Sequence, residues 1–445
     1  ILAQDTCLSH GDLRIDADIL TPGPKMRTPS TFTHACARIG GPSSPKGAKR
    51  EVAACNPLHF FSRRRPSSQV QLDAICPRLV EDLCQLAASD PADSRFSRND
   101  QERVQENVQG ELQAITQVLE HVFDQEVTSA AIGINHHHEK AEELLAQFLT
   151  ADLPTLLVSN LTRLDFEVKK EVINVHSAIM RLTSLPWADA HVRDYAKGSP
   201  NFFQLLIEGY SKPEVATHCG IMLRYCARQQ HLVEFFFANP ETLLRLVSLA
   251  QHENFDISSD AFSTLHDFLL VHKTKSSAFL EKNFSEFFPL YNHLLMSDDY
   301  VTQRQALKLL SETLLDRTFS RVMIAYVGDV FYLQLNMKLL LADSNAIQFE
   351  AFQIFKVFAA NPRKPPRVQQ ILHKNTDKLI DLLQKIRSYK EDDKQFSKDM
   401  ATVLGALRAM QLPPKVAAGK AAGGQVCCTN LAPAQRDCGP SLIIG

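Results

Sequence analysis

Glycine and tryptophan are scarce in this chain, with 17 glycines and one tryptophan among 445 residues. Rossmann and P-loop domains need glycine turns that bring the backbone close to phosphates, and neither fingerprint occurs. No apolar run reaches the roughly 18–20 residues that a membrane-spanning helix requires. The formal net charge of −2 gives no overall attraction to nucleic acid or anionic lipid. The sequence therefore excludes the common nucleotide-binding folds, and it predicts neither nucleic acid nor a membrane as partner.

Cysteine is present, with ten residues, but its placement does not indicate a disulfide framework. Three cysteines lie in the polar head and three in the tail, while Cys219 and Cys226 stand seven residues apart on one expected helical face. Buried thiols are ordinary at such positions. We therefore expect a reducing compartment and a cytoplasmic location.

The two ends of the chain lack hydrophobic periodicity. Residues 1–67 are rich in Pro, Ser and Arg, and residues 412–445 form a weakly patterned tail. We predict that both ends are disordered. For residues 1–67, a transit segment and an extension from a doubtful gene model are the alternatives. Between the repeats and the tail, residues 388–411 hold a charged break and one further predicted helix.

Residues 68–387 have the periodicity of α-helices, and from residue 150 onward the pattern repeats. Five apolar stretches begin 42–47 residues apart. Four of them carry a small residue four or five places on and Leu or Phe eight places on, which is one face of a helix. A second apolar helix lies between successive stretches. The five stretches begin at Val168, Val215, Ile257, Val301 and Ile347.

This period, with two or three helices in each repeat, is typical of armadillo and HEAT arrays. We predict an all-α, armadillo/HEAT-like helical-repeat solenoid, a curved rod with disordered ends. No single repeat can bury its apolar faces, so stacking buries them and leaves a concave side for a partner. A globular helical bundle with accidental self-similarity is the alternative.

Catalytic and metal-binding motifs are missing from the sequence. No Walker motif, G-x-S-x-G or kinase catalytic loop occurs, and no EF-hand loop surrounds the paired aspartates. Positions that read bases in RNA-binding repeats differ here from repeat to repeat. The run His136, His137 and His138 lies in a predicted loop between helices. We predict no enzyme, no cofactor and no metal; an enzyme or metal protein that uses these histidines is the alternative.

Two groups of residues suggest surfaces for a partner. Tyr300, Arg304 and Lys308 are spaced one helical turn apart, and Arg317 follows them. An aromatic ring and cations on one exposed stripe are typical of interface hot spots, although a solvated helix face has the same pattern. Lys374 and Lys378 are also predicted to lie one turn apart, near the apolar helix LQLNMKLLL. That combination suits a peptide with an acidic or carboxy-terminal end, and core packing with surface lysines is the alternative.

Four long strings in the chain resemble the calcium-binding protein 39 family of kinase scaffolds. They are HCGIMLRYC, FDISSDAFSTLHDFL, YVTQRQALKLLSETLLDR and AIQFEAFQIFKVFAANP, and the likeness covers about residues 70–385. The resemblance implies an armadillo-like, non-catalytic rod. It also implies a concave face that binds a STRAD-like pseudokinase with liver kinase B and activates Ste-type, germinal-centre kinases.

The resemblance also assigns residues to sites. Tyr300, Arg304, Lys308 and Arg317 match the family's concave kinase-binding positions. Met337, Lys374 and Lys378 match its pocket for a Trp-Glu-Phe-like C-terminal peptide. Two departures are Gln334, where many members have Lys, and Thr318-Phe319, where an x-Asn-Phe step is usual and a helix start is in doubt. A repeat adaptor in cell polarity or division, without a kinase partner, is the alternative function.

Overall fold

The computed structural model describes residues 74–88, 98–126, 134–387 and 393–411, and within these ranges every regular element is a helix. The predictions for residues 1–67 and 412–445 lie outside the described residues. The first helices are α2 (Ile75–Ala88), α3 (Arg98–Glu126), α4 (Ile134–Thr150), α5 (Leu153–Asn160), η2 (Leu161–Arg163), α6 (Phe166–Leu182), α7 (Pro186–Gly198), α8 (Asn201–Tyr210) and α9 (Ala216–Ala227). They are followed by α10 (Gln230–Ala238), α11 (Pro240–Leu249), α12 (Phe255–Leu270), α13 (Lys273–Lys282), α14 (Phe284–Leu295), α15 (Tyr300–Leu315) and η3 (Arg317–Phe319). The last are α16 (Ser320–Gly328), α17 (Val330–Leu339), α18 (Asn345–Ala360), α19 (Pro366–Lys374), α20 (Thr376–Arg387) and α21 (Lys394–Arg408).

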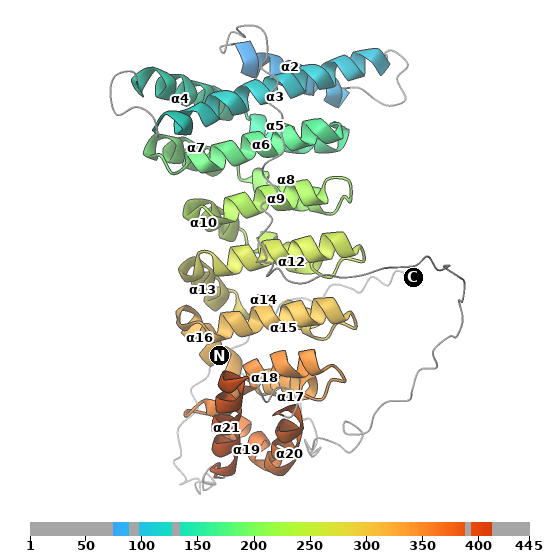
Figure 1. Ribbon diagram of the computed structural model, residues 1–445, viewed down its shortest axis with the longest axis vertical. Helices are drawn as coiled ribbons and strands as arrows, with labels where there is room; N and C mark the ends of the chain where they lie inside the picture. Colours follow the sequence, from blue (N-terminus) through green and yellow to red (C-terminus); the bar gives the residue numbers. More distant parts are fainter. Residues whose placement is uncertain (1–73, 89–97, 127–133, 388–392, 412–445) are drawn as a thin grey trace, which may run out of the picture.

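The helices stack as three-helix repeats in an elongated column (Figure 1). The first helices of the repeats, among them α4, α7, α10 and α13, lie along one side of the column, on the left of the view. The third helices are α6, α9, α12, α15, α18 and α21; together with α3 they contact one another in chain order and form one face. We call this surface the third-helix face. The predicted armadillo-like solenoid is confirmed.

Four of the third helices carry a small, fully buried residue at the equivalent position. Cys219, Ala261, Ala306 and Ala351 are all 0% exposed. Small side chains let two helices approach closely, so these positions fix the stack. The predicted start of the fourth stretch, Val301, lies one residue too early. Thr302, 7% exposed, takes the place there of the buried Val or Ile that starts the other stretches, whereas Val301 is only half-buried.

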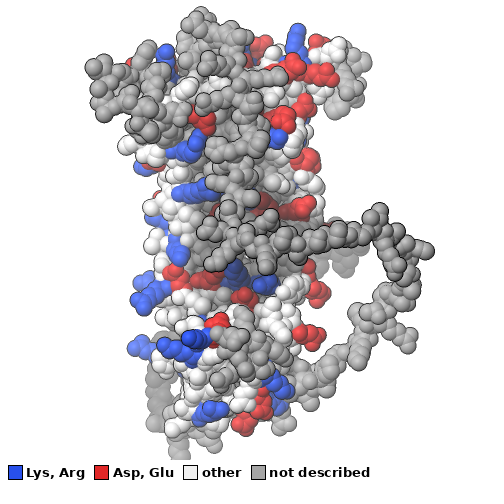
Figure 2. Space-filling view, viewed as in Figure 1, with Lys and Arg blue, Asp and Glu red and all other residues white. Residues whose placement is uncertain are grey.

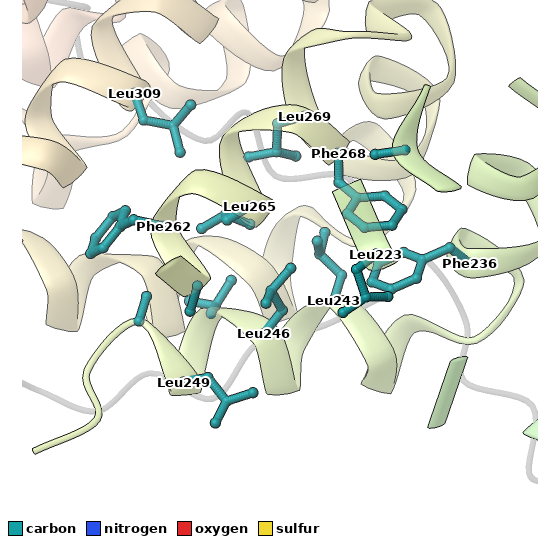
Figure 3. Close-up of a cluster of buried hydrophobic side chains, with 14 of the residues drawn as sticks. Leu223, Phe236, Leu243, Leu246, Leu249, Phe262, Leu265, Phe268, Leu269 and Leu309 are labelled. Atoms are coloured by element: carbon teal, nitrogen blue, oxygen red, sulfur yellow. The ribbon is translucent and has the colours of Figure 1, made fainter. Parts of the chain in front are cut away.

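Aromatic and aliphatic side chains fill the space within each repeat and between neighbouring repeats. Phe236 of α10 stacks on Phe268 of α12, with ring centroids 3.8 Å apart. Leu223 of α9 and Leu309 of α15 lie on either side of α12 in the same cluster (Figure 3). Each buried side chain of this size contributes roughly 1.5–3 kcal/mol by leaving water. The repeats are therefore held by a continuous core instead of separate ones.

The array continues past the predicted boundary at residue 387. Helix α21 contacts α18 and α20 as the third helix of a last repeat. Phe396 of α21 lies 5.1 Å from the ring centroids of both Phe349 and Phe352. Lys356 of α18 also donates to Asp399, with Nζ and Oδ2 2.7 Å apart. The helix predicted within 388–411 thus closes the rod.

The histidine run begins a helix. Helix α4 starts at Ile134, so His136 to His138 belong to its first turns and not to a loop. Among the described residues, no group of three His, Cys, Asp or Glu side chains is placed to hold a metal ion.

None of the described helices is by itself long and apolar enough to cross a membrane. One bent pair, His138–Thr150 with Leu153–Arg163, meets the requirement by length and composition only.

One core position holds a histidine, which makes the stability of the fold depend on pH. His176 of α6 is 6% exposed, and its Nε2–H donates to the carbonyl of Met222 at 3.1 Å. Burial lowers the pKa of His176 from 6.5 to about 4. The unfolded chain therefore binds an extra proton between these values, so the stabilising effect of neutral His176 is lost as the pH falls from 6.5 towards 4.

We expect the free energy of unfolding to drop by about 2 kcal/mol between pH 7 and pH 5 on account of His176. Urea titrations of the wild type and of His176→Gln at both pH values check this, because glutamine keeps a donor and cannot titrate there. An equal drop in both proteins would assign the pH effect to other groups.

Candidate partner-binding surface

Helix α15 presents the predicted stripe on the third-helix face. The helix begins at Tyr300 because the Asp299 side chain caps it, accepting from the Thr302 amide at 2.7 Å. The same hydrogen bond lowers the pKa of Asp299. One edge of α15, which includes Ala306, packs into the core. The opposite edge carries Tyr300 and faces solvent, and Tyr300 is 46% exposed. Arg304 and Lys308 are exposed on the same edge.

The cations of this stripe are poorly neutralised by the rest of the described chain. Within the described residues, Arg304 and Arg317 form no ion pair. Lys308 reaches Glu312 only at 3.9 Å, and its side chain is 64% exposed. Charges that have no partner in the free protein are available to one in a complex.

Helix α6 has an aromatic residue and a cation at the positions equivalent to Tyr300 and Arg304, but this cation has partners on its own helix. There Phe166 and Lys170 occupy the places of Tyr300 and Arg304. The Lys170 ammonium lies 4.2 Å from the centroid of the Phe166 ring and 2.9 Å from Glu167 Oε1. In α15 the residue that follows the aromatic is Val301 in place of an acid. The stripe on α15 therefore differs from an ordinary solvated helix face by the missing partner.

Arg317 stands in a short, well-fixed turn after α15. Asp316 caps this turn by accepting from the Thr318 amide at 2.9 Å, and it also accepts from Lys273 Nζ at 2.6 Å. The Lys273 ammonium is the main reason that the pKa of Asp316 falls to about 2. Phe319 is fully buried and α16 begins at the next residue. The departure at Thr318-Phe319 is thus accommodated by η3.

A histidine of α12 lies beside the stripe. His266 Nε2 is 3.4 Å from Glu312 Oε2, and its Nδ1 is 3.4 Å from Asp267 Oδ1. The hydrogen bond to Asp267 is the largest cause of a raised pKa for His266. His266 and Lys308 therefore share the carboxylate of Glu312, each facing a different oxygen.

The residues of the predicted peptide pocket lie in different environments. Met337 of α17 is 5% exposed and belongs to the core. Lys374 is the last residue of α19, whereas Lys378 lies in α20, so the two do not share one helix as the sequence predicted. Asn375 separates the two helices, and both lysines are exposed. Gln334 is half-buried on α17, which contacts α19.

A polar network behind the third-helix face went unpredicted. Arg224 Nη1 of α9 lies 2.9 Å from Asp260 Oδ1 of α12, and 2.9 Å from Thr264 Oγ1. Tyr210 of α8 donates to the other oxygen of Asp260. The only sequence signal was Gly220 inside a helix, since a Cβ there would overlap both Asp260 Oδ2 and the Tyr210 hydroxyl. This network ties three helices of two repeats together.

The third-helix face is electrically divided. Figure 2 shows Lys and Arg gathered over the left and centre of its lower half, while Asp and Glu follow the right edge. A divided face of this kind favours one orientation of a partner, because like charges repel in the others.

Stacked three-helix repeats with an exposed, unneutralised stripe on one face define a helical-repeat scaffold. A model of the Mo25-like family matches residues 60–411, which is most of the chain. The chain belongs to the Mo25-like family.

Individual relatives agree with this assignment. The calcium-binding protein 39-like protein of Mus musculus is 35% identical over 360 residues, covering 80% of this chain and 98% of that protein. The degreening-related gene dee76 protein of Auxenochlorella protothecoides is 38% identical over 310 residues, covering 70% of this chain and 93% of its own. The Mo25-like protein of Schizosaccharomyces pombe is 40% identical over 268 residues, covering 59% of this chain and 79% of its own.

Proposed function

We propose that this protein is a non-catalytic scaffold that binds a Ste-type protein kinase or a STRAD-like pseudokinase on its third-helix face and holds it in the active conformation. The observation that carries the proposal is the contrast between α15 and α6. Among the described residues Arg304 has no acidic partner, whereas Lys170 at the equivalent position has two internal contacts. A surface that leaves such cations unpaired suits an acidic patch on another protein.

Activation by such a scaffold requires no chemistry of its own. A kinase exchanges between conformers, and a partner that binds one of them more tightly raises its population. The shift is limited by the difference in affinity, and a tenfold preference corresponds to about 1.4 kcal/mol. A stack of repeats is suited to this role, because it offers an extended surface that can contact a whole face of the kinase.

The test is binding of the full chain to a panel of Ste-type kinases, with kinase activity as a second readout. Wild type and Arg304→Ala/Lys308→Ala are compared in pull-downs, and the double variant is expected to recover at least about tenfold less kinase. Equal recovery of kinase by both proteins would show that the stripe is not part of the interface. Binding without any change in kinase activity would favour the alternative, an adaptor in cell polarity or division.

A second surface around α19 and α20 is proposed for a Trp-Glu-Phe-like C-terminal peptide of the partner. The exposed ammonium groups of Lys374 and Lys378 lie at the junction of these helices and suit carboxylates. Met337 is a poor probe of this site, since truncating a buried methionine costs about 2–5 kcal/mol of stability.

We expect Lys374→Glu/Lys378→Glu to weaken a peptide ending in Trp-Glu-Phe by about tenfold or more, because two attractive charges become repulsive. Fluorescence anisotropy with the labelled peptide measures this. Lys282→Glu/Lys275→Glu on α13 is the control with the same change in charge. If both double variants weaken peptide binding equally, the effect comes from net charge and the proposed peptide site is wrong.

A further inference from the structure

A hollow opens on the third-helix face one repeat before the cationic stripe. It has a volume of about 420 Å³ and lies between the start of α9 and the first turns of α12. Ser259 and Ser263 of α12 line it, at the positions that Arg304 and Lys308 hold on α15. On the α9 side the helix begins only at Ala216, since residues 213–215 form a turn. Small side chains and a missing helical turn thus create the space.

The lining of the hollow is negative. The described residues around it include two carboxylates and no Lys, Arg or His. Asp260 is neutralised by Arg224 at 2.9 Å, which leaves Asp256 as the exposed charge that no cation of the described residues pairs with. An apolar aromatic ring stands at the same place, because Phe255 is 59% exposed. A carboxylate beside an open aromatic face is favourable for a cation.

Three backbone amides at the hollow are already hydrogen-bonded within the protein. The Asn254 side chain accepts from the amides of Asp256 and Ile257, at 2.9 and 3.3 Å. On the other side, the amide of Ala216 donates to the Lys212 carbonyl at 2.8 Å. Because these donors are engaged, the hollow is a weaker site for phosphate or carboxylate than a helix start with free amides.

We propose that this hollow takes an arginine side chain of the protein partner. A planar guanidinium stacks on an aromatic face while its N–H groups donate sideways, which suits Phe255 beside the Asp256 carboxylate. The serine hydroxyls accept further hydrogen bonds. The proposal rests on the proposed function, in that the partner is the kinase that the α15 stripe binds. Stacked helices lie about 10 Å apart, so the partner carries an arginine about that far from the acids that meet Arg304.

The test uses simple peptides in place of the kinase, so that its result does not depend on the proposed function. Labelled (Gly-Arg)4, (Gly-Lys)4 and (Gly-Glu)4 peptides are titrated into the full chain at low salt. We expect the arginine peptide to bind most tightly and the glutamate peptide not to bind. Asp256→Lys is expected to weaken the arginine peptide about tenfold, and Phe255→Ala several-fold.

The matched control is Glu241→Lys, which makes the same reversal in the first turn of α11, outside the third-helix face. Ser263→Phe is a second variant that fills the hollow without changing charge, and it is also expected to weaken the arginine peptide. Equal weakening by Asp256→Lys and Glu241→Lys, or no preference of the wild type for arginine, would overturn the proposal. Arg304→Glu/Lys308→Glu must still bind the peptide, so loss of kinase binding in that variant tests the stripe alone.

Discussion

Arg304→Glu/Lys308→Glu is expected to weaken kinase binding by about a hundredfold or more, because two exposed cations become anions that face the partner's acids. Each exposed side chain contributes little to the fold, so the melting temperature should change by no more than a few degrees. Calorimetric titration against a kinase recovered in the panel measures the affinity, and thermal unfolding measures the stability. The loss should shrink as salt is raised, since added ions screen the repulsion.

A matched control is available away from both proposed surfaces. Arg245 of α11 and Lys282 of α13 are one arginine and one lysine, both exposed and outside the third-helix face. Arg245→Glu/Lys282→Glu changes the net charge by the same amount and should leave the affinity within about threefold. A hundredfold loss in this control as well would mean that net charge, and not the stripe, governs binding.

Gly220→Ala is expected to destabilise the fold by about 3 kcal/mol, from one added methyl group. The new Cβ would overlap Asp260 Oδ2 and the Tyr210 hydroxyl, neither of which is free to move. Asp260 is held by Arg224 at 2.9 Å, and the Tyr210 hydroxyl lies 2.9 Å from Thr264 Oγ1. Either the network opens and leaves a half-buried charge unpaired, or α9 moves away from α12. Urea unfolding measures the loss directly.

Gly405→Ala on α21 is the control, and it is expected to change stability in the opposite direction. Apart from its chain neighbours and the backbone of its own helix, no described heavy atom lies within 4 Å of a Cβ built there. Alanine is a better helix former than glycine by about 0.5–1 kcal/mol, so this variant should be slightly more stable than the wild type. Should both alanine variants shift stability in the same direction, crowding at Gly220 would not be the cause.

The sequence predicted the helices and their stack well. The period of 42–47 residues predicted the stack, and the small residues Ala261, Ala306 and Ala351 marked the buried face of each helix. Both features can be found in the sequence because they recur at a fixed spacing. The error of one residue at Val301 shows the limit of that signal. Valine and Thr302 both suit a buried helical position, and only the Asp299 cap decides where α15 begins.

The candidate surface was only partly predictable. Helical spacing placed Tyr300, Arg304 and Lys308 on one edge, and the structure agrees. Spacing also placed Lys374 and Lys378 on one helix, which is wrong because α19 ends between them. The hollow beside Phe255 had no sequence signal, since it arises from a turn that α9 lacks and from serines that are unremarkable by themselves.

The sequence by itself determined the repeat, the helical class and the edge of α15 that faces outward. These features depend on periodicity within about 45 residues, which can be read directly from the order of the amino acids. Tertiary structure alone decided that Asp260 is neutralised by an arginine 36 residues away, and that Arg304 finds no ion-pair partner among the described residues. The physical reason is that pairing and burial depend on distances between helices of different repeats. Those distances are fixed by how side chains fill the core, and no local pattern records them.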